Sequence, residues 1–456
     1  MDQSQHRLPQ TDRPLTAKRV DDSIAAGTRG GRRRLRPRLA AVPQWGMSEL
    51  ADNVLPLIRT RADLHRRGST AHGKQMSVAV DRLAAAAASG TDPRDVLLVT
   101  QKAIASATTL IMRADDSSGY MGDAIRGLLA LHPQVAVDAR PTPSKLVKWM
   151  VDFQFHNECD FFTIDPVAYA PALGERGIAA YRAELEEIRE ELGPPVIDPE
   201  RPWAAEFGRS RFALAHNDRR LAVLDRDVDK IIDTHARHQP NAAFLQDTAI
   251  ALAEIGEIDL AIEYARKTSD LGSGFQSQAA AGYLSELISE HRPTELLSTR
   301  LDTFARWPSF ATATDLHEAA GDEWPDLADD VLTKLADRPR ELILFLLRTL
   351  GNVESAWQQA HSSKLGDEEV WLELVNAYET IDPVAVLGPL QSIVEKRLAT
   401  AHPHNYRQAT RVLTRMRRIA AGTTAANTVS ELIDRLRTEN RNRPRLQAEF
   451  DQAGLK

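Results

Sequence analysis

The stretches "NAAFLQDTAIALAEIG" (residues 241–256) and "EIDLAIEYARKTSDLG" (residues 257–272) predict two helices joined by a tight turn. Apolar residues recur in both stretches at the spacing of one helix face. Gly256 favours a left-handed cap that ends the first helix, and Ala261 and Ala265 lie one turn apart on the second. Small side chains at this spacing let two helices pack closely, so the sequence predicts a helical hairpin.

A second hairpin repeats this spacing about a hundred residues later. "PRELILFLLRTLG" ends at Gly351, and the next stretch carries Ala356 and Ala360 five and nine residues after that glycine. The physics resembles that of tetratricopeptide repeats, although the repeat length is not constant. "HEAAGDEWPDLADDVLTKLAD" (residues 317–337) offers a third copy, in which Pro325 starts the second helix. We therefore expect degenerate tetratricopeptide-like repeats.

The rest of the chain also favours helices, because the period-two alternation typical of strands never persists. The prediction is an all-α protein, with an N-terminal helical domain followed by an irregular tetratricopeptide-like α-solenoid. "GPPVIDPERPW" holds four prolines and cannot continue a helix, so it marks a linker. The expected divisions are a disordered basic arm at 1–46, which precedes an alternative start at Met47, a helical domain at 47–193, a proline-rich linker at 194–202 and the repeat domain at 203–456.

Charge and cysteine content narrow the function classes. The formal net charge is −7, and the first 46 residues hold ten Lys and Arg against four Asp and Glu, so the body carries −13. An acidic body gains little from phosphate neutralisation, which argues against nucleic-acid binding. Cys159 is the single cysteine and excludes an intramolecular disulfide. No run approaches the roughly 18 apolar residues of a membrane span, and we expect a cytoplasmic protein.

Four stretches carry a family resemblance. They are "ADDSSGYMGDAIRGLLALH", "KLVKWMVDFQFHNECDFFTIDPVAYAPALGERGIAAYRAELEEI", "AEIGEIDLAIEYA" and "NYRQATRVLTRMRRI…LIDRLRTENRNRPRLQAEFDQAGL". Through them, the chain from about residue 75 onward resembles an uncharacterised bacterial helical family that is found downstream of SWIM-type zinc fingers in larger proteins. This resemblance implies a helical-repeat architecture and little chemistry. A SWIM finger needs a C-x-C pair and a later C-x-H, which a chain with Cys159 alone cannot supply.

"MRADDSSGYMGD" (residues 112–123) interrupts the helical pattern with carboxylates, serines and glycines. As a site, Asp115, Asp116 and Asp123 would bind a divalent cation, since hard cations prefer carboxylate oxygens. As a turn, Asp and Ser accept hydrogen bonds from the free N–H groups of a helix that starts near Tyr120. Gly119 and Gly122 would then permit close helix approach. The turn explains every residue type, so we favour it and predict no bound metal or cofactor.

Two further groups combine residue types used in catalysis or metal binding. Asp152, His156, Cys159, Asp160 and Asp165 crowd the segment 152–165, where a cysteine and histidine could act as nucleophile and base. No third residue is placed to orient that base, and a cysteine among aromatic residues is usually a small buried hydrophobe. His235 and His238 have a spacing that can chelate zinc, but they lack an accompanying carboxylate or cysteine. We predict no catalytic residue in either group.

The C-terminal helices carry many arginines. A solvated helix face is the default interpretation, and an acidic partner, protein or nucleic acid, is the alternative. The aromatic interleaving that favours single-stranded nucleic acid is missing. The candidate basic binding face consists of Arg411, Arg415, Arg418, Arg437, Arg441, Arg443 and Arg445.

Three functions remain open, in this order. The first is a non-enzymatic scaffold that binds a protein along the solenoid, because solenoids expose extended binding surfaces. The second is a nucleic-acid-associated accessory protein that uses the C-terminal arginines. The third is a metal-dependent enzyme, which requires Asp115, Asp116 and Asp123 to converge with the carboxylates of the segment 152–165.

Overall fold

The protein is described by a computed structural model, which covers residues 48–157, 159, 161–194, 208–236 and 241–455. Regular structure in these ranges is helical, and the β-type pairing there is one isolated bridge between Leu64 and Ala114. The prediction of an all-α fold is thus confirmed. The chain divides into units of residues 1–48 and 49–456, and all helices below lie in the second. The predicted arm and nearly all of the predicted linker lie outside the described residues.

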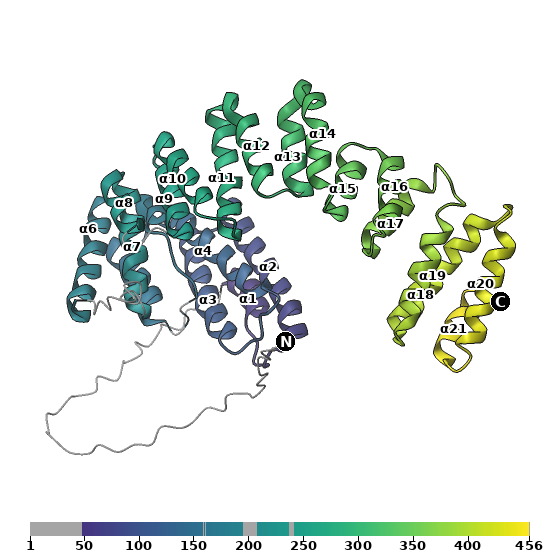
Figure 1. Ribbon diagram of the computed structural model, residues 1–456. Helices are drawn as coiled ribbons and strands as arrows, with labels where there is room; N and C mark the ends of the chain where they lie inside the picture. Colours follow the sequence, from purple (N-terminus) through teal and green to yellow (C-terminus); the bar gives the residue numbers. More distant parts are fainter. Residues whose placement is uncertain (1–47, 158, 160, 195–207, 237–240, 456) are drawn as a thin grey trace, which may run out of the picture. The chain divides into compact units, whose positions relative to one another are not determined.

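The first hydrophobic core joins the helices α1 to α7 (Figure 1). Its centre is the packing of α4 against α2 and α3, and α5 and α6 pack beside them. α7 follows the predicted linker, yet it contributes Leu214 and Leu221 to the same core. The bounds are α1 Glu49–Ile58, α2 Arg66–Ala88, α3 Pro93–Ile111, α4 Tyr120–Ala139, α5 Pro143–Val151, a π-helical turn η1 Asp152–His156, α6 Pro166–Leu192 and α7 Arg209–Asp225.

Three buried polar side chains close a ring of hydrogen bonds inside this core. Gln154 Nε2 donates to the Tyr181 hydroxyl (2.6 Å), which donates to Asn217 Oδ1 (2.7 Å). Asn217 Nδ2 completes the ring by donating to Gln154 Oε1 (3.0 Å). Buried polar groups are tolerated when each one is paired, so the ring fixes η1, α6 and α7 in one register.

Replacing Tyr181 with phenylalanine should destabilise this core. The substitution keeps the ring volume but leaves the Gln154 donor and the Asn217 acceptor unpaired, which costs roughly 1–3 kcal/mol. Urea unfolding followed by circular dichroism measures the loss. Tyr283→Phe is the control, because that half-buried hydroxyl has no hydrogen bond with a described residue. Equal stability of the two variants would contradict this role of the ring.

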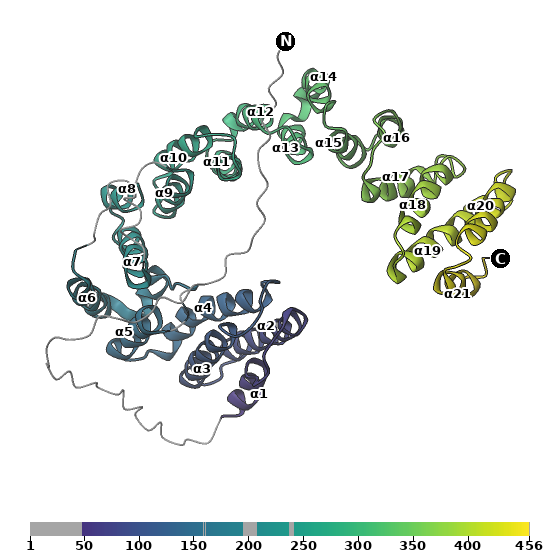
Figure 2. The same cartoon turned by 60° about the horizontal axis from the view of Figure 1, so that its bottom comes forward.

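The helices after α7 pack mainly on their neighbours in the sequence (Figures 1 and 2). This contact pattern is that of a helical-repeat protein. A second core spans α7 to α11, and a third spans α12 to α21. The bounds are α8 Val228–Ala236, α9 Ala242–Glu254, α10 Ile258–Asp270, α11 Phe275–His291, η3 Pro293–Glu295, α12 Leu296–Arg306, α13 Phe310–Ala320, η4 Gly321–Glu323, α14 Trp324–Leu335, α15 Pro339–Leu344, η5 Phe345–Thr349, α16 Val353–Ser362, α17 Glu368–Tyr378, α18 Leu387–Ala399, α19 Pro403–Ala420, α20 Ala426–Glu439 and α21 Pro444–Gln452.

Both predicted hairpins are present. α9 and α10 pack side by side across a turn in which Gly256 has φ +87°, and Ala261 and Ala265 are buried at their contact. Gly351 has φ +62°, and Ala356 and Ala360 are fully buried. Left-handed glycine and small buried alanine thus fulfil their predicted roles.

The third predicted copy is less regular. Pro325 lies in the first turn of α14, as expected. Ala328 remains half-buried, and the buried contacts of α14 come from Val331 and Leu335. Here larger side chains, rather than alanine, set the distance between the helices.

Candidate functional site

The segment 112–123 forms the connection between α3 and α4. Asp116 accepts hydrogen bonds from the backbone N–H groups of Met121 (3.2 Å) and Gly122 (2.8 Å), one on each carboxylate oxygen. Asp115 accepts from the N–H of Ser117 (3.2 Å), and this bond lowers the pKa of the Asp115 carboxyl. Asp116 thus caps the start of α4 and Asp115 stabilises the turn before it, which is the role that the sequence favours.

The close approach expected of Gly119 and Gly122 occurs elsewhere. Gly119 has φ +77° and open space where a Cβ would lie, so it supplies a left-handed conformation. A Cβ on Gly122 would meet Asp116 Oδ2 at an ordinary 3.4 Å. The close contact is made by Gly73 of α2, where a Cβ would lie 2.6 Å from Tyr120 Cβ. The sequence analysis does not single out Gly73. The signal that could have found it is a glycine inside a predicted helix, where glycine is unfavourable.

The third carboxylate of the proposed metal site has its own partner. Asp123 Oδ1 lies 2.5 Å from Arg126 Nη1. Within the described ranges, no three His, Cys, Asp or Glu side chains are grouped to hold a metal ion. The structure therefore brings Asp115, Asp116 and Asp123 to one turn but engages them in hydrogen bonds and an ion pair.

The residues of the segment 152–165 also have separate partners. His156 Nδ1 lies 3.1 Å from Asp152 Oδ1 on an exposed surface, whereas Cys159 is buried. Asp165 caps α6 and binds Arg220, and Asp160 lies outside the described residues. The structure thus shows a helix cap at Asp165 and an exposed Asp152–His156 pair in this segment.

His235 is a core residue. Its Nδ1 lies 2.9 Å from the Ile231 carbonyl oxygen, and burial lowers the pKa of the imidazole to about 4. His238, the other half of the proposed chelate, lies outside the described residues.

Four of the seven arginines in the candidate basic face bind carboxylates or carbonyls of the same chain. Arg415 and Arg418 bind Glu379, which directly follows α17. Arg437 donates to Asp451 (2.5 Å) and Arg443 to the Leu398 carbonyl (2.6 Å). Three members are exposed and have no ion pair with a described residue: Arg411, Arg441 and Arg445.

Arginines connect helices elsewhere in the same manner. Arg220 of α7 bridges Asp165, before α6, and Glu254 of α9, both at 2.7 Å. Arg348 of η5 pairs with Glu373 of α17 (2.6 Å). Much of the arginine content therefore links neighbouring helices, which sequence analysis missed because ion pairs between distant residues leave no local pattern.

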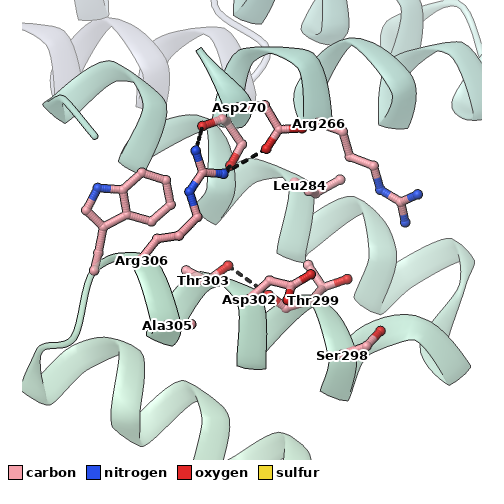
Figure 3. A pocket seen from close by; sticks show the side chains of 11 residues that line it. Arg266, Asp270, Leu284, Ser298, Thr299, Asp302, Thr303, Ala305 and Arg306 are labelled. Carbon is pink, nitrogen blue, oxygen red and sulfur yellow. Dashed lines mark hydrogen bonds and ion pairs between the residues drawn. The ribbon is translucent and has the colours of Figure 1, made fainter. Parts of the chain in front are cut away.

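A groove of about 490 Å³ lies among α10, α11 and α12 (Figure 3). Arg306 extends across it to Asp270 (2.8 Å), while Asp302 lies beside Thr299. Arg306 Nη2 also donates to the Ser269 carbonyl (2.7 Å). The groove is lined by Arg266, Ser269, Asp270, Leu284, Ser298, Thr299, Asp302, Thr303, Ala305, Arg306 and Trp307.

The loop 271–274 joins α10 to α11, and the apolar side chains of Leu271 and of Phe275, the first residue of α11, are exposed. Leu271 is 48% exposed and Phe275 is 84% exposed. Two hydrogen bonds fix the backbone of the loop. Arg306 Nη2 donates to the Gly272 carbonyl (3.3 Å), and Trp307 Nε1 donates to the Ser273 carbonyl (3.0 Å). An aromatic side chain is thus presented to solvent on a fixed backbone.

Comparison with known proteins places most of the chain in one group. A family model described as "Family of unknown function (DUF6880)" matches residues 23–307. Among solved structures, the chain is similar to a "Circular tandem repeat protein with novel repeat topology and enhanced subunit contact surfaces", with 15% identity over 89% of this chain and 87% of that chain, and a TM-score of 0.15. The search of curated proteins yields no match. None of the described helices is long and apolar enough to cross a membrane.

Proposed function

The chain belongs to the DUF6880 family, whose function is unknown, and from this premise we propose that it is a non-enzymatic scaffold that binds another protein through its helical repeats. The observation that carries the proposal is Phe275, 84% exposed at the start of α11, directly after a loop whose Gly272 and Ser273 carbonyls are bound by Arg306 and Trp307. Scattered apolar residues are normal on protein surfaces. An exposed phenylalanine on an ordered backbone is the kind of anchor that dominates protein interfaces, because little backbone entropy is lost when it is buried.

The geometry favours a protein partner over nucleic acid. Four of the seven arginines in the candidate basic face are bound to carboxylates or carbonyls of the chain itself. The three that have no ion pair with a described residue stand against a body with a formal charge of −13. We propose a cytoplasmic scaffold, which the single cysteine supports.

Removing the exposed side chains of Leu271 and Phe275 should abolish partner capture. The double variant Leu271→Ser/Phe275→Ser removes both exposed apolar side chains. We expect the purified full chain to retain a partner from native lysate at moderate salt and after nuclease treatment, and the double variant to lose at least ten-fold of it. Quantitative mass spectrometry of the bound fraction measures this loss.

Ile381→Ser is the matched control, since Ile381 is as exposed as Leu271 but lies on another loop. It should capture as much partner as the wild-type chain. Undiminished capture by the double variant would overturn the proposal for Leu271 and Phe275. Capture that disappears with nuclease or salt would support the arginine-based alternative.

A further inference from the structure

A second groove lies beyond the residues that match the family model. It has a volume of about 500 Å³ and is formed by the end of α16, by α17 and by α18, which follow one another in Figure 1. Its lining is more apolar than that of the first groove. Such a volume is in the range of pockets that enclose a ligand side chain or small molecule. The lining is Ala360, His361, Lys364, Leu365, Gly366, Glu368, Trp371, Gly388, Pro389, Ser392, Ile393 and Lys396.

One wall of this groove is a fixed aromatic cluster. The His361 and Trp371 rings meet edge to face at 4.9 Å, and Trp357 contacts both rings from beneath the surface. Trp371 Nε1 donates to the Leu365 carbonyl (2.8 Å), so its polar atom is satisfied. Pro389 of α18 is buried and also lines the groove. The wall is therefore preformed to receive an apolar ring by edge-to-face or offset stacking.

The open edge of the groove is basic. Lys364 and Lys396 are both exposed, and Lys396 Nζ donates to the Gly366 carbonyl (3.2 Å). Glu368 is the acidic residue of the lining, and Arg397 binds it through Nε (2.7 Å) and Nη2 (2.5 Å). Because Glu368 is already neutralised, the two lysines determine the charge that a ligand meets at this edge.

The backbone at Lys364 adopts a conformation that usually requires glycine. Lys364 has φ +51°, a left-handed conformation at the end of α16. The comparable ends of α9 and η5 use Gly256 and Gly351, which adopt this conformation without steric cost. Lys364 thus keeps a cation beside the groove in a conformation that costs a side chain energy, as Arg140 and Arg226 do at the ends of α4 and α7.

We propose that this groove binds an acidic peptide segment of a protein partner, with an aromatic side chain of that segment in the cavity and its carboxylates beside Lys364 and Lys396. The cavity requires an apolar ring, and the lysines require negative charge within a few residues of it. This inference rests on the proposed scaffold function and names the chemistry of the partner.

Binding of a defined peptide to the full chain tests the proposal. The probe is fluorescein-labelled Gly-Asp-Glu-Phe-Glu-Asp-Gly, measured by fluorescence anisotropy. We expect saturable binding that weakens with salt. A peptide with Asn and Gln in place of the acids, and one with Ala in place of Phe, should each bind at least ten-fold more weakly. Equal binding of either control peptide would overturn the proposal, because it would remove the need for charge or for the ring.

Three variants of the chain locate the binding. Lys364→Gly removes the cation and relieves the backbone, so it folds at least as well as wild type and should bind the probe at least five-fold more weakly. Ser392→Trp should block the cavity while keeping both lysines. Arg140→Gly is the matched control, since Arg140 is another exposed left-handed cation at a helix end and should leave binding unchanged.

The result also separates this inference from the scaffold proposal. Unchanged probe binding by Lys364→Gly and Ser392→Trp would overturn the groove assignment, while lysate capture that depends on Phe275 would still support the scaffold. Lysate capture that does not depend on Phe275, together with probe binding that does depend on Lys364, would overturn the Phe275 surface alone.

Discussion

Substitution of Gly73 with alanine should strongly destabilise the first core. The new methyl group would lie 2.6 Å from Tyr120 Cβ, 2.8 Å from the Tyr120 carbonyl carbon and 2.9 Å from the Met121 nitrogen. Two of these atoms are backbone at the start of α4, where Asp116 holds the N–H groups of Met121 and Gly122. The contact cannot relax by rotating a side chain, so we expect a loss at or above the usual 1–3 kcal/mol of overpacking.

The same helix provides the control. Gly68 also lies within α2, but a Cβ there would meet Leu64 Cδ2 at an ordinary 3.5 Å. Gly68→Ala should therefore stabilise the protein by up to about 1 kcal/mol through helix propensity. Thermal and urea unfolding of both variants measure the difference, and a Gly73→Ala protein as stable as Gly68→Ala would contradict the packing of α2 on α4.

Local patterns account for the part of the fold that the sequence predicts. The positions of Gly256 and Gly351 follow from helix-capping chemistry, which acts over a few residues, and the burial of the alanines after them follows from helix periodicity. Gly73 shows what such patterns omit. Its role depends on Tyr120, which is distant in the sequence and becomes a neighbour only when α2 packs on α4.

The same distinction applies to the candidate sites. Asp116 acts within its own turn, and its residue type and position predict that role. Arg415 was grouped with other arginines because they are close in the sequence, but its partner is Glu379, 36 residues away. A charge run predicts a basic face only where tertiary ion pairs leave it free. The groove beside Lys364 also escaped sequence analysis, because its walls come from three helices.

His132 makes the first core sensitive to acid through its burial. The imidazole is fully buried and stacks on Trp149, with ring centroids 3.8 Å apart. Its Nδ1 lies 2.8 Å from the Tyr169 hydroxyl and its Nε2 lies 3.1 Å from Gln101 Nε2. Since an amide nitrogen can only donate, the neutral imidazole accepts at Nε2 and donates from Nδ1. Desolvation lowers the pKa of His132 from 6.5 to about 3.

The stability of the protein should therefore fall as the pH decreases below 6.5. The unfolded chain binds a proton at this histidine near pH 6.5, whereas the folded chain does not until about pH 3, so acid favours unfolding. At 1.36 kcal/mol per pH unit, the contribution lost by pH 4.5 is about 2.7 kcal/mol. His235 and His216, whose pKa values are also lowered by burial, add to the loss in the same direction.

Urea unfolding of wild type and His132→Gln at pH 7.5 and pH 4.5 isolates the contribution of this residue. The variant cannot take up the proton, so its stability relative to wild type should rise by about 2.7 kcal/mol between the two pH values, whatever its stability at pH 7.5. His404→Gln, which removes an exposed imidazole, is the control for the substitution itself. Parallel curves for wild type and His132→Gln would show that burial of this imidazole does not govern the response of the fold to acid.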